Sequence, residues 1–348
     1  MKTELKNALE YLKKRKKNIL KYSMIIVVLL LAVYAFWDSL EDALAEMKRI
    51  SANQIFLILI LACVYQILDG ANITMLASNG KNKLKLLKGE YCMLLASFFR
   101  VITFGSGAGV ATIAFLVKEK YPVSEATGIS AINYMLHKVM IALFCVGLMI
   151  LRFPVIRAQY GSYFQYLVLS MALVTVIVLF YLFMCTSRKF HKIILSVVSL
   201  FNKKGRHDKW VSETSSQFED LEIYSTQLLG NKKRIAVILL FDLLKFISWY
   251  SIPFVLLHGS VEISYIDCLT RMAFAIAIAG VLPSPAGIGS TEFAFLLLFA
   301  QIAIQKTLLS TVLLYRSATF VFIGLLGGIV LFCVYITKII YNRRHPFS

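Results

Sequence analysis

Six uninterrupted apolar runs constrain this chain more than any other feature, because each is long enough to cross the hydrocarbon core of a bilayer, which takes about 20 residues. The runs cover residues 19–37, 55–78, 127–151, 163–185, 235–257 and 308–335. The first run follows a lysine-rich leader, residues 1–18, and lacks a small-residue cleavage site, which favours an uncleaved anchor over a signal peptide. We therefore predict an all-α polytopic membrane protein with six full transmembrane helices.

The positive charges indicate how the spans are oriented. Of the 37 Lys and Arg residues, 25 fall in four segments beside the spans, residues 1–22, 79–89, 186–234 and 338–344. Such clusters are typical of cytoplasmic loops, whereas residues 38–54 and 258–267 lean acidic and suit the opposite side. We expect a plasma-membrane protein with both termini and a basic loop, 186–234, in the cytoplasm. The net charge of +18 then favours anionic lipid as the neighbour and argues against nucleic acid.

The chain shows no pattern typical of a catalytic or metal centre. Its six cysteines have neither CxxC nor His/Cys ligand spacing and lie in or beside apolar runs, which predicts small core residues, with no disulfide, metal or cofactor. No nucleophile elbow or acyltransferase motif is visible. We expect no catalytic residues and no enzyme activity.

Two further apolar stretches, about residues 89–117 and 268–304, are interrupted by glycine and proline. If residues 89–117 crossed the membrane completely, the basic loop 186–234 would face outside, against the charge bias. The number of crossings between the loop 186–234 and the basic C-terminal end is subject to the same bias. Both are in the cytoplasm only if residues 268–304 enter and leave on the outer side. We predict two opposed re-entrant helical hairpins within a single membrane domain, residues 19–348.

A shift of 180 residues aligns the two interruptions. "VITFGSGAGVATIAFLV" (101–117) then lies on "VLPSPAGIGSTEFAFLL" (281–297), with six identities in seventeen positions. Two of the identities are glycines at the breaks. Because the halves have opposite predicted orientation, this pattern is typical of the inverted repeats of transporters.

The interruptions predict a lined cavity, because irregular backbone in a bilayer is tolerated only where protein or water satisfies its polar groups. Half-helix amino termini at such tips favour a phosphate or carboxylate. A kink at a helix contact is the alternative. The residues that we expect at the tips are Gly105, Gly107, Gly109, Pro283, Pro285, Gly287 and Gly289.

Ionisable residues at membrane depth are the other candidates for a site, since a charge there costs at least ~2.5–3.5 kcal/mol on insertion scales. The set comprises Asp69, Arg100, His137, Lys138, Asp242, Lys245, Arg271, Glu292 and Arg316. Arg316 lies deep in the last span, which favours a functional role, and Glu292 begins a half-helix, where it either stabilises the helix start or contacts substrate. We expect a binding role for Glu292, Arg316, Asp69, Lys138 and Arg100.

These motifs resemble a known family. "LPSPAGIGSTEF" followed by "YRSATFVFIGLLGG", together with "ITFGSGAGVATIAFLVKEKYPVSEATG", is similar to the transmembrane flippase-like domain of lysylphosphatidylglycerol synthases of the multiple peptide resistance factor type. The resemblance spans nearly the whole chain and implies opposed hairpins, movement of aminoacylated phosphatidylglycerol between leaflets, functional roles for Glu292, Arg316 and Asp69, and a homodimer. The first motif departs from the family at Phe104 and at "AGVA" (108–111), and we expect the soluble synthase domain to be absent.

We therefore predict a flippase that passes a phospholipid headgroup through a central polar cavity. Two alternatives remain. One is transport of another envelope lipid, such as a polyprenyl phosphate. The other is a non-transporting membrane partner that recruits a separate synthase or glycosyltransferase, with an amphipathic helix in residues 186–234 serving either that contact or an interfacial anchor.

Overall fold

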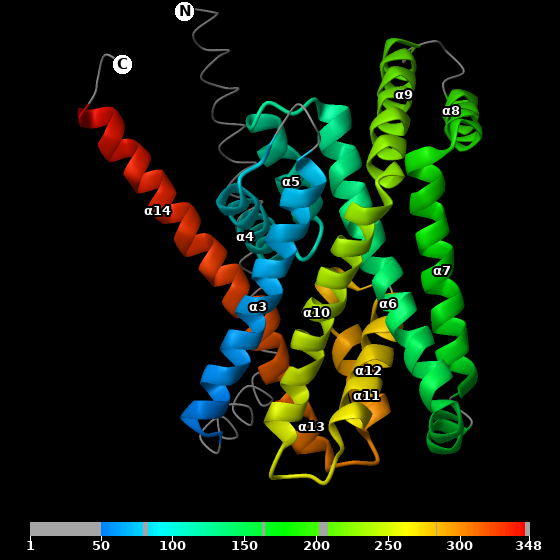
Figure 1. Ribbon diagram of the computed structural model, residues 1–348, viewed down its shortest axis with the longest axis vertical. Coiled ribbons are helices and arrows are strands. Elements are labelled where there is room, and N and C mark those ends of the chain that lie inside the picture. Colours follow the sequence, from blue (N-terminus) through cyan, green and yellow to red (C-terminus); the bar gives the residue numbers. More distant parts are fainter. Residues whose placement is uncertain (1–49, 79–82, 162–163, 202–207, 283, 345–348) are drawn as a thin grey trace, which may run out of the picture. The chain divides into compact units, whose positions relative to one another are not determined.

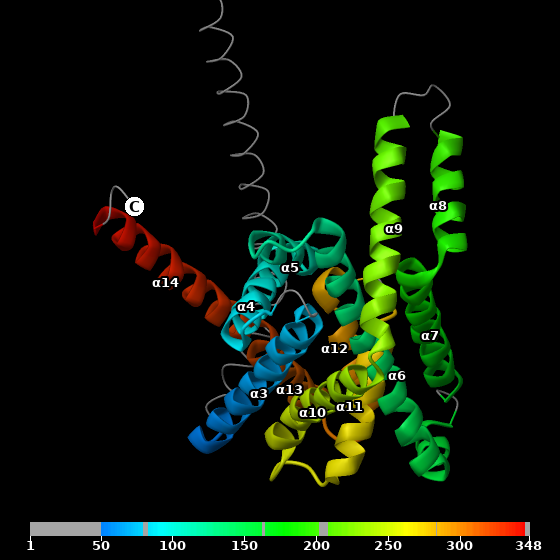
Figure 2. The same cartoon turned by 45° about the horizontal axis from the view of Figure 1, so that its top comes forward.

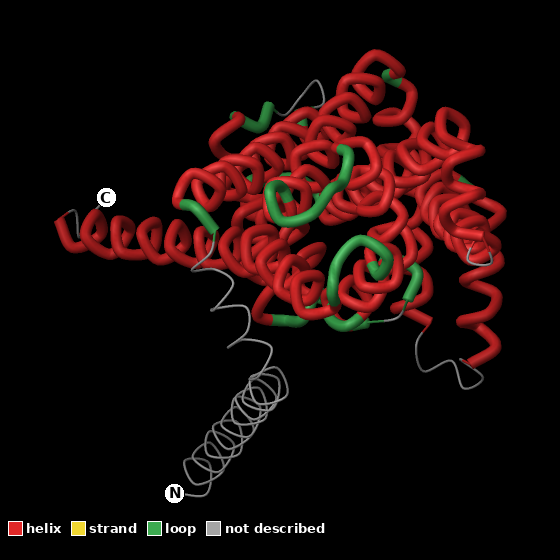
Figure 3. Tube along the Cα trace, turned by 90° about the horizontal axis from the view of Figure 1, so that it is seen from below, coloured by secondary structure: helices red, strands yellow, loops and turns green. Residues whose placement is uncertain are grey.

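The computed structural model describes residues 50–78, 83–161, 164–201, 208–282 and 284–344. The regular structure of these residues is helical throughout (Figure 3). The leader, the predicted span 19–37 and Pro283 lie outside the described residues, as does the acidic segment up to residue 49.

Five helices of the described part are long and apolar enough to cross a membrane, and they coincide with the five predicted spans that fall there. They are α3 (Ala52–Ala77), α6 (Val123–Tyr160), α7 (Phe164–Thr186), α10 (Lys232–Leu257) and the continuous run Gln305–Thr337. That last run comprises α13 (Gln305–Arg316), the π-helical turn η3 (Ser317–Phe322) and the first part of α14 (Ile323–Arg344). The prediction of a polytopic helical membrane protein is confirmed.

Two pairs of short helices form the predicted hairpins. The inner hairpin comprises α4 (Leu86–Ile102) and α5 (Gly107–Lys118), and the outer hairpin comprises α11 (Tyr265–Ala279), the 3-10 turn η2 (Pro285–Gly287) and α12 (Ser290–Phe299). None of the four α-helices is long enough to cross a bilayer alone, at 1.5 Å of rise per residue. In Figure 1 the inner hairpin enters from the top of the bundle and the outer hairpin from the bottom.

The 180-residue repeat extends over the secondary structure of both halves. Adding 180 to the bounds of α3 gives 232–257, which are the bounds of α10. The same shift takes α4 to 266–282, α5 to 287–298 and α6 to 303–340, close to α11, α12 and the pair α13–α14. Helices α3 and α10 pack along each other and run in opposite directions (Figure 1). The two halves are thus inverted with respect to each other.

The repeats also interlock. Helix α14 of the second half packs against α4 of the first, and α6 of the first half packs against α11 of the second. Gly327 makes the first contact close, because a Cβ there would stand 2.2 Å from the Leu94 carbonyl oxygen. In lipid, where burial of apolar surface gives helices little reason to associate, such close backbone approach is a main source of packing energy.

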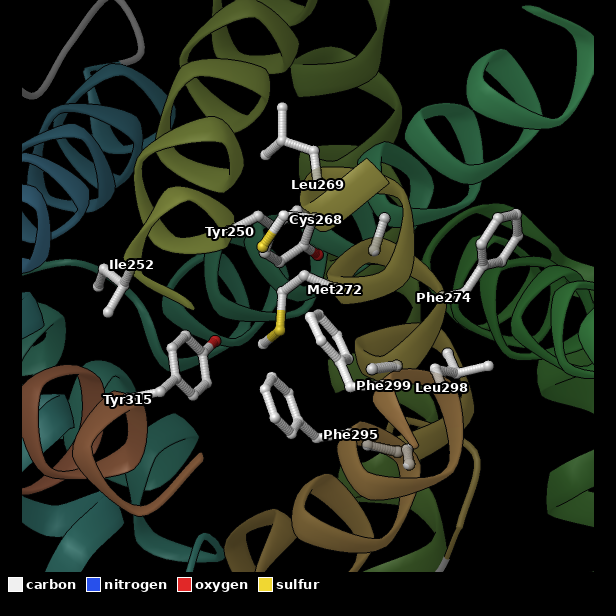
Figure 4. Packing of buried hydrophobic residues seen from close by; sticks show 14 of the residues in the cluster. Tyr250, Ile252, Cys268, Leu269, Met272, Phe274, Phe295, Leu298, Phe299 and Tyr315 are labelled. Carbon is white, nitrogen blue, oxygen red and sulfur yellow. The ribbon is translucent and has the colours of Figure 1, made fainter. Parts of the chain in front are cut away.

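A buried apolar cluster holds the outer hairpin in place. Phe295 and Phe299 of α12 stack with ring centroids 4.1 Å apart, and they face Met272 of α11 and Tyr315 of α13 (Figure 4). All four side chains are at most 2% exposed. A second cluster joins the inner hairpin to α3 and to the first half of α6. Each hairpin is therefore packed on protein, which supplies the partners that its irregular backbone needs.

The basic loop 186–234 contains two helices, α8 (Arg188–Phe201) and α9 (Asp208–Gly230). They lie side by side in Figures 1 and 2. The Arg188 Nε–H donates to both carboxylate oxygens of Glu222. The His191 ring stacks on Phe218 with ring centroids 4.7 Å apart. The division of the chain into domains stays a prediction.

Candidate functional site

The two hairpin tips meet and form one wall of a cavity of about 750 Å³. Gly105 of the inner tip has φ +97° and lies against the backbone of Ala286 in the outer tip. A Cβ added to Gly105 would lie 3.0 Å from the backbone N and Cα atoms of Ala286. The positive φ and the close approach both call for glycine at this position. The remaining walls come from α3, α4, α6, α7 and α10. This geometry agrees with the hypothesis that the interruptions line a cavity.

Two of the cations that line the cavity have no carboxylate partner among the described residues. The side chains of Arg100 on α4 and Lys138 on α6 make no hydrogen bond or ion pair within the part of the chain that the structure describes. Lys138 is 9% exposed, and its ammonium lies 5.5 Å from the centre of the Tyr134 ring and beside Gly280. Cations left unpaired in a low-dielectric site favour an anion there.

Asp69 also lines the cavity, but its carboxylate is already paired with the Lys245 ammonium. The Lys245 ammonium donates to Asp69 Oδ1 at 2.7 Å and lies 2.7 Å from Asp242 Oδ1, which also accepts from Asn72 Nδ2 at 2.9 Å. All four side chains are buried between α3 and α10. Among the described lining residues Asp69 is the one carboxylate, so the unpaired charge facing the cavity is positive.

Repeat symmetry organises this network. Residues 65 and 69 of α3 correspond to residues 245 and 249 of α10 after the shift of 180. The contacts cross over: Asp69 pairs with Lys245, and Tyr65 stacks on Trp249 with ring centroids 3.4 Å apart. Sequence reasoning named Asp242 and Lys245 without their partners and missed Trp249 and Tyr65. The signal that could have found them was the same 180-residue shift, applied to α3.

Glu292 and Arg316, which the sequence names as candidates for substrate binding, form an ion pair with each other at the outer tip. The Glu292 carboxylate accepts from the Gly289 backbone N–H at 2.7 Å and lies 3.4 Å from Arg316 Nε. Arg316 Nη2 donates to the Ala286 carbonyl at 3.0 Å. Neither side chain is among the residues lining the cavity. Their contacts fix the backbone of the tip that touches Gly105.

The amino termini of the half-helices α5 and α12 differ in whether a carboxylate of the chain already contacts them. Ala108 and Gly109, in the first turn of α5, line the cavity, so the positive end of that helix dipole faces the cavity. The first turn of α12 is already served by Glu292. The predicted pair of anion-binding helix ends is therefore reduced to the inner one, because the outer one carries its own carboxylate.

The other predicted residues are distributed around the tips. Gly287 lines the cavity with φ +75°, Pro285 begins η2, and Gly289 precedes α12 with φ +83°. Gly107 begins α5 and lines a separate groove beside the cavity. Arg271 lies away from the cavity: it donates to the Leu298 carbonyl and lies over the Tyr160 ring, 5.6 Å from its centre. His137 lines the cavity next to Lys138.

Comparison with known proteins agrees with this architecture. Residues 23–327 match the family described as the lysylphosphatidylglycerol synthase TM region. A search of curated proteins gives no match. The matching family is defined by the membrane region, and the match covers most of the chain, so the chain belongs to the lysylphosphatidylglycerol synthase transmembrane-region family.

Proposed function

We propose that this membrane protein binds the phosphate of a phospholipid headgroup in the central cavity and carries the headgroup between leaflets. The observation that supports the proposal most is the pair of unpaired cations, Arg100 and Lys138, facing a cavity built by both hairpin tips. A phosphate diester would accept charge-assisted hydrogen bonds from both, each worth about 1.5–3 kcal/mol. The acyl chains would stay in hydrocarbon while the charged group passes through protein.

The substrate in this proposal is aminoacylated phosphatidylglycerol or a related lipid. Its ammonium needs a partner other than Asp69, which Lys245 already holds. Trp249 lines the same cavity, and its indole ring suits a cation, at about 0.5–2 kcal/mol, whereas the Tyr134 ring already has the Lys138 ammonium over it. Phosphate on the two cations and ammonium on the Trp249 ring is the arrangement that we propose.

The tip contact is the gate in this mechanism. The cavity is lined by the first half of α6, from Thr127 to Lys138, and by the two tips, which meet at Gly105 and Ala286. With α6 entering from the cytoplasm, the cavity opens towards the inner leaflet. Glu292 and Arg316 act as positioning residues that hold the outer tip, and movement of that tip away from Gly105 would pass the headgroup outward.

Leaflet exchange in reconstituted vesicles tests the proposal. The unaltered protein is compared with Arg100→Gln/Lys138→Gln and with Arg157→Gln as a control, because Arg157 is exposed at the far end of α6. We expect the double variant to lose at least about tenfold in exchange of labelled lysylphosphatidylglycerol, since two charge-assisted hydrogen bonds are removed. Glu292→Gln and Arg316→Ala should also slow exchange. Equal exchange by all five proteins would remove these residues from the mechanism.

The alternatives give different outcomes in the same vesicles. A polyprenyl-phosphate carrier would require phosphate and ignore the ammonium, so it would exchange a polyprenyl phosphate faster than lysylphosphatidylglycerol. A recruiting protein would exchange neither, and deletion of the α8–α9 helices would abolish its cellular function while the cavity substitutions left it intact. Sidedness and location in the plasma membrane remain part of this proposal.

A further inference from the structure

A second concavity lies beside the inner hairpin, on the side of α5 that faces away from the cavity. It is a groove of about 670 Å³ between α4, α5 and Leu331 of α14. Helix α5 separates the two spaces: Ala108, Gly109 and Thr112 line the cavity, whereas Val110, Ala114 and Lys118 line the groove. The two spaces share one described residue, Ser106, at the tip.

The groove has the length of one leaflet. On α5 its wall runs from Gly107 to Lys118, eleven rises of 1.5 Å or about 16 Å. Half of a hydrocarbon core is about 15 Å. The wall is concave because α5 places small residues there, Gly107, Ala111 and Ala114, opposite the larger Leu95 and Phe99 of α4. An acyl chain fits such a space by depth and by chemistry.

The two ends of the groove differ. Lys118 stands exposed at the surface end, and its ammonium makes no ion pair or hydrogen bond with the described residues, while neighbouring Glu119 is paired with Lys88. At the tip end the hydroxyls are used locally, by Thr103 towards the Phe99 carbonyl and by Ser106 towards the Thr103 carbonyl. One end therefore offers a free cation and the other presents groups that are already satisfied.

We propose that this groove binds one acyl chain of an anionic diacyl phospholipid of the leaflet on the Lys118 side. The lipid phosphate lies at Lys118, and the terminal methyl group lies near Ser106. The site goes beyond the proposed function, because α5 separates it from the headgroup cavity, and either can fail without the other. A bound chain would support α5 from behind, where its opposite face forms the cavity wall.

A third space is also apolar but has no charged residue in its lining. It has about 420 Å³ and lies between α7, α11 and α12. Its lining, which includes Leu169, Ile278 and Phe293, contains no charged residue. This third space therefore has no cation that could hold a lipid headgroup, and it serves as the comparison for the groove between α4 and α5.

Photo-crosslinking tests the site on the full chain in nanodiscs. The probe is phosphatidylglycerol with a diazirine near the end of one acyl chain, and the labelled peptides are identified by mass spectrometry. We expect labelling of residues 103–111, at the Ser106 end of the groove, to exceed labelling of the third space, which Leu169 and Phe293 line. Ala114→Trp, which fills the groove, should reduce it at least about fivefold. Ala172→Trp, on an exposed position of α7 outside the described cavities, should leave it unchanged.

The headgroup end has its own pair of variants. Lys118→Gln should reduce labelling about fivefold, since a lysine near an anionic lipid surface contributes ~1 kcal/mol. Lys120→Gln, equally exposed but outside the groove, should not. If Ala114→Trp fails to fold, the lysine pair still decides. Equal labelling of both grooves, or equal effects of the two lysine variants, would overturn the proposal whatever the outcome of the leaflet-exchange assay.

Discussion

Lys245 is a fully buried ammonium, 1% exposed, that two carboxylates share. Removing it would leave Asp69 and Asp242 as buried charges without a cation. We expect Lys245→Met to lower the free energy of unfolding by about 3–5 kcal/mol, the range found when one partner of a buried pair is removed. The measurement is denaturant unfolding in detergent, with Lys232→Met, exposed on the same helix, as the control.

A triple variant separates the charge from the packing. In Asp69→Asn/Asp242→Asn/Lys245→Met no buried charge is left uncompensated, so we expect it to be more stable than Lys245→Met alone. The comparison is made in the same detergent and denaturant. A triple variant that unfolds as readily as the single one would mean that shape, and not charge compensation, accounts for the cost.

Asp267, in the first turn of α11, gives the protein a dependence on pH. Burial raises the pKa of this carboxyl, but hydrogen bonds from Ser264 and Arg152 outweigh burial and hold it below its usual range. A folded-state pKa below the unfolded value of about 3.9 means that the stabilisation is present above that pH and is lost as pH falls through the lower folded value. We expect stability to fall below about pH 4 and Asp267→Asn to flatten that fall.

Glu262 supplies the matched control for this titration. It is exposed in the loop that precedes α11. Glu262→Gln should leave the acid limb of a plot of unfolding midpoint against pH unchanged. If Asp267→Asn preserved the same acid limb as the wild type, the pair with Arg152 would not be its source.

At the scale of elements, the contact between the hairpin tips depends on one glycine. A Cβ on Gly105 would meet the Ala286 backbone at 3.0 Å, and the residue has φ +97°. Strained backbone of this kind costs about 1–3 kcal/mol for other residues. We expect Gly105→Ala to destabilise the protein by that amount and to change the rate of leaflet exchange, because the tips must shift apart.

Gly147 on α6 is the control for that substitution. An added Cβ there meets nothing within 4 Å, and its φ is ordinary. Gly147→Ala should therefore keep or slightly raise stability, by up to about 1 kcal/mol, since alanine is the better helix former. Thermal unfolding of both variants distinguishes a specific effect of the tip contact from a general sensitivity to extra volume.

The elements could be predicted from the sequence because their signals are local. Apolar length predicts the spans, and the proline and glycine breaks together with charge parity predict the hairpins. The direction of each side chain was not accessible, because in lipid both the packed and the exposed faces of a helix are apolar. Arg316 illustrates this: its depth was evident, but its turn towards Glu292 and the Ala286 carbonyl depends on how the outer tip folds. The Asp69–Lys245 pair joins residues that are 176 positions apart.

For the whole molecule, inversion of the two halves makes a prediction about sidedness. Lys120 lies in the turn between α5 and α6, and Ser260 lies in the turn between α10 and α11; both are exposed. In Figure 1 these turns lie at opposite ends of the helices. Single cysteines at the two positions should therefore react with a membrane-impermeant thiol reagent from opposite sides of a vesicle.

The charge bias predicts which side is which, since basic loops remain in the cytoplasm. We expect Lys120→Cys to be labelled in inside-out vesicles and Ser260→Cys in right-side-out vesicles, each in a Cys333→Ser background because Cys333 is an exposed native thiol. The remaining described cysteines are buried or half-buried in the bundle. Labelling of both positions from one side would mean that the hairpins enter from the same face. The tips could then not meet across the membrane, and a gate between the leaflets would have no structural basis.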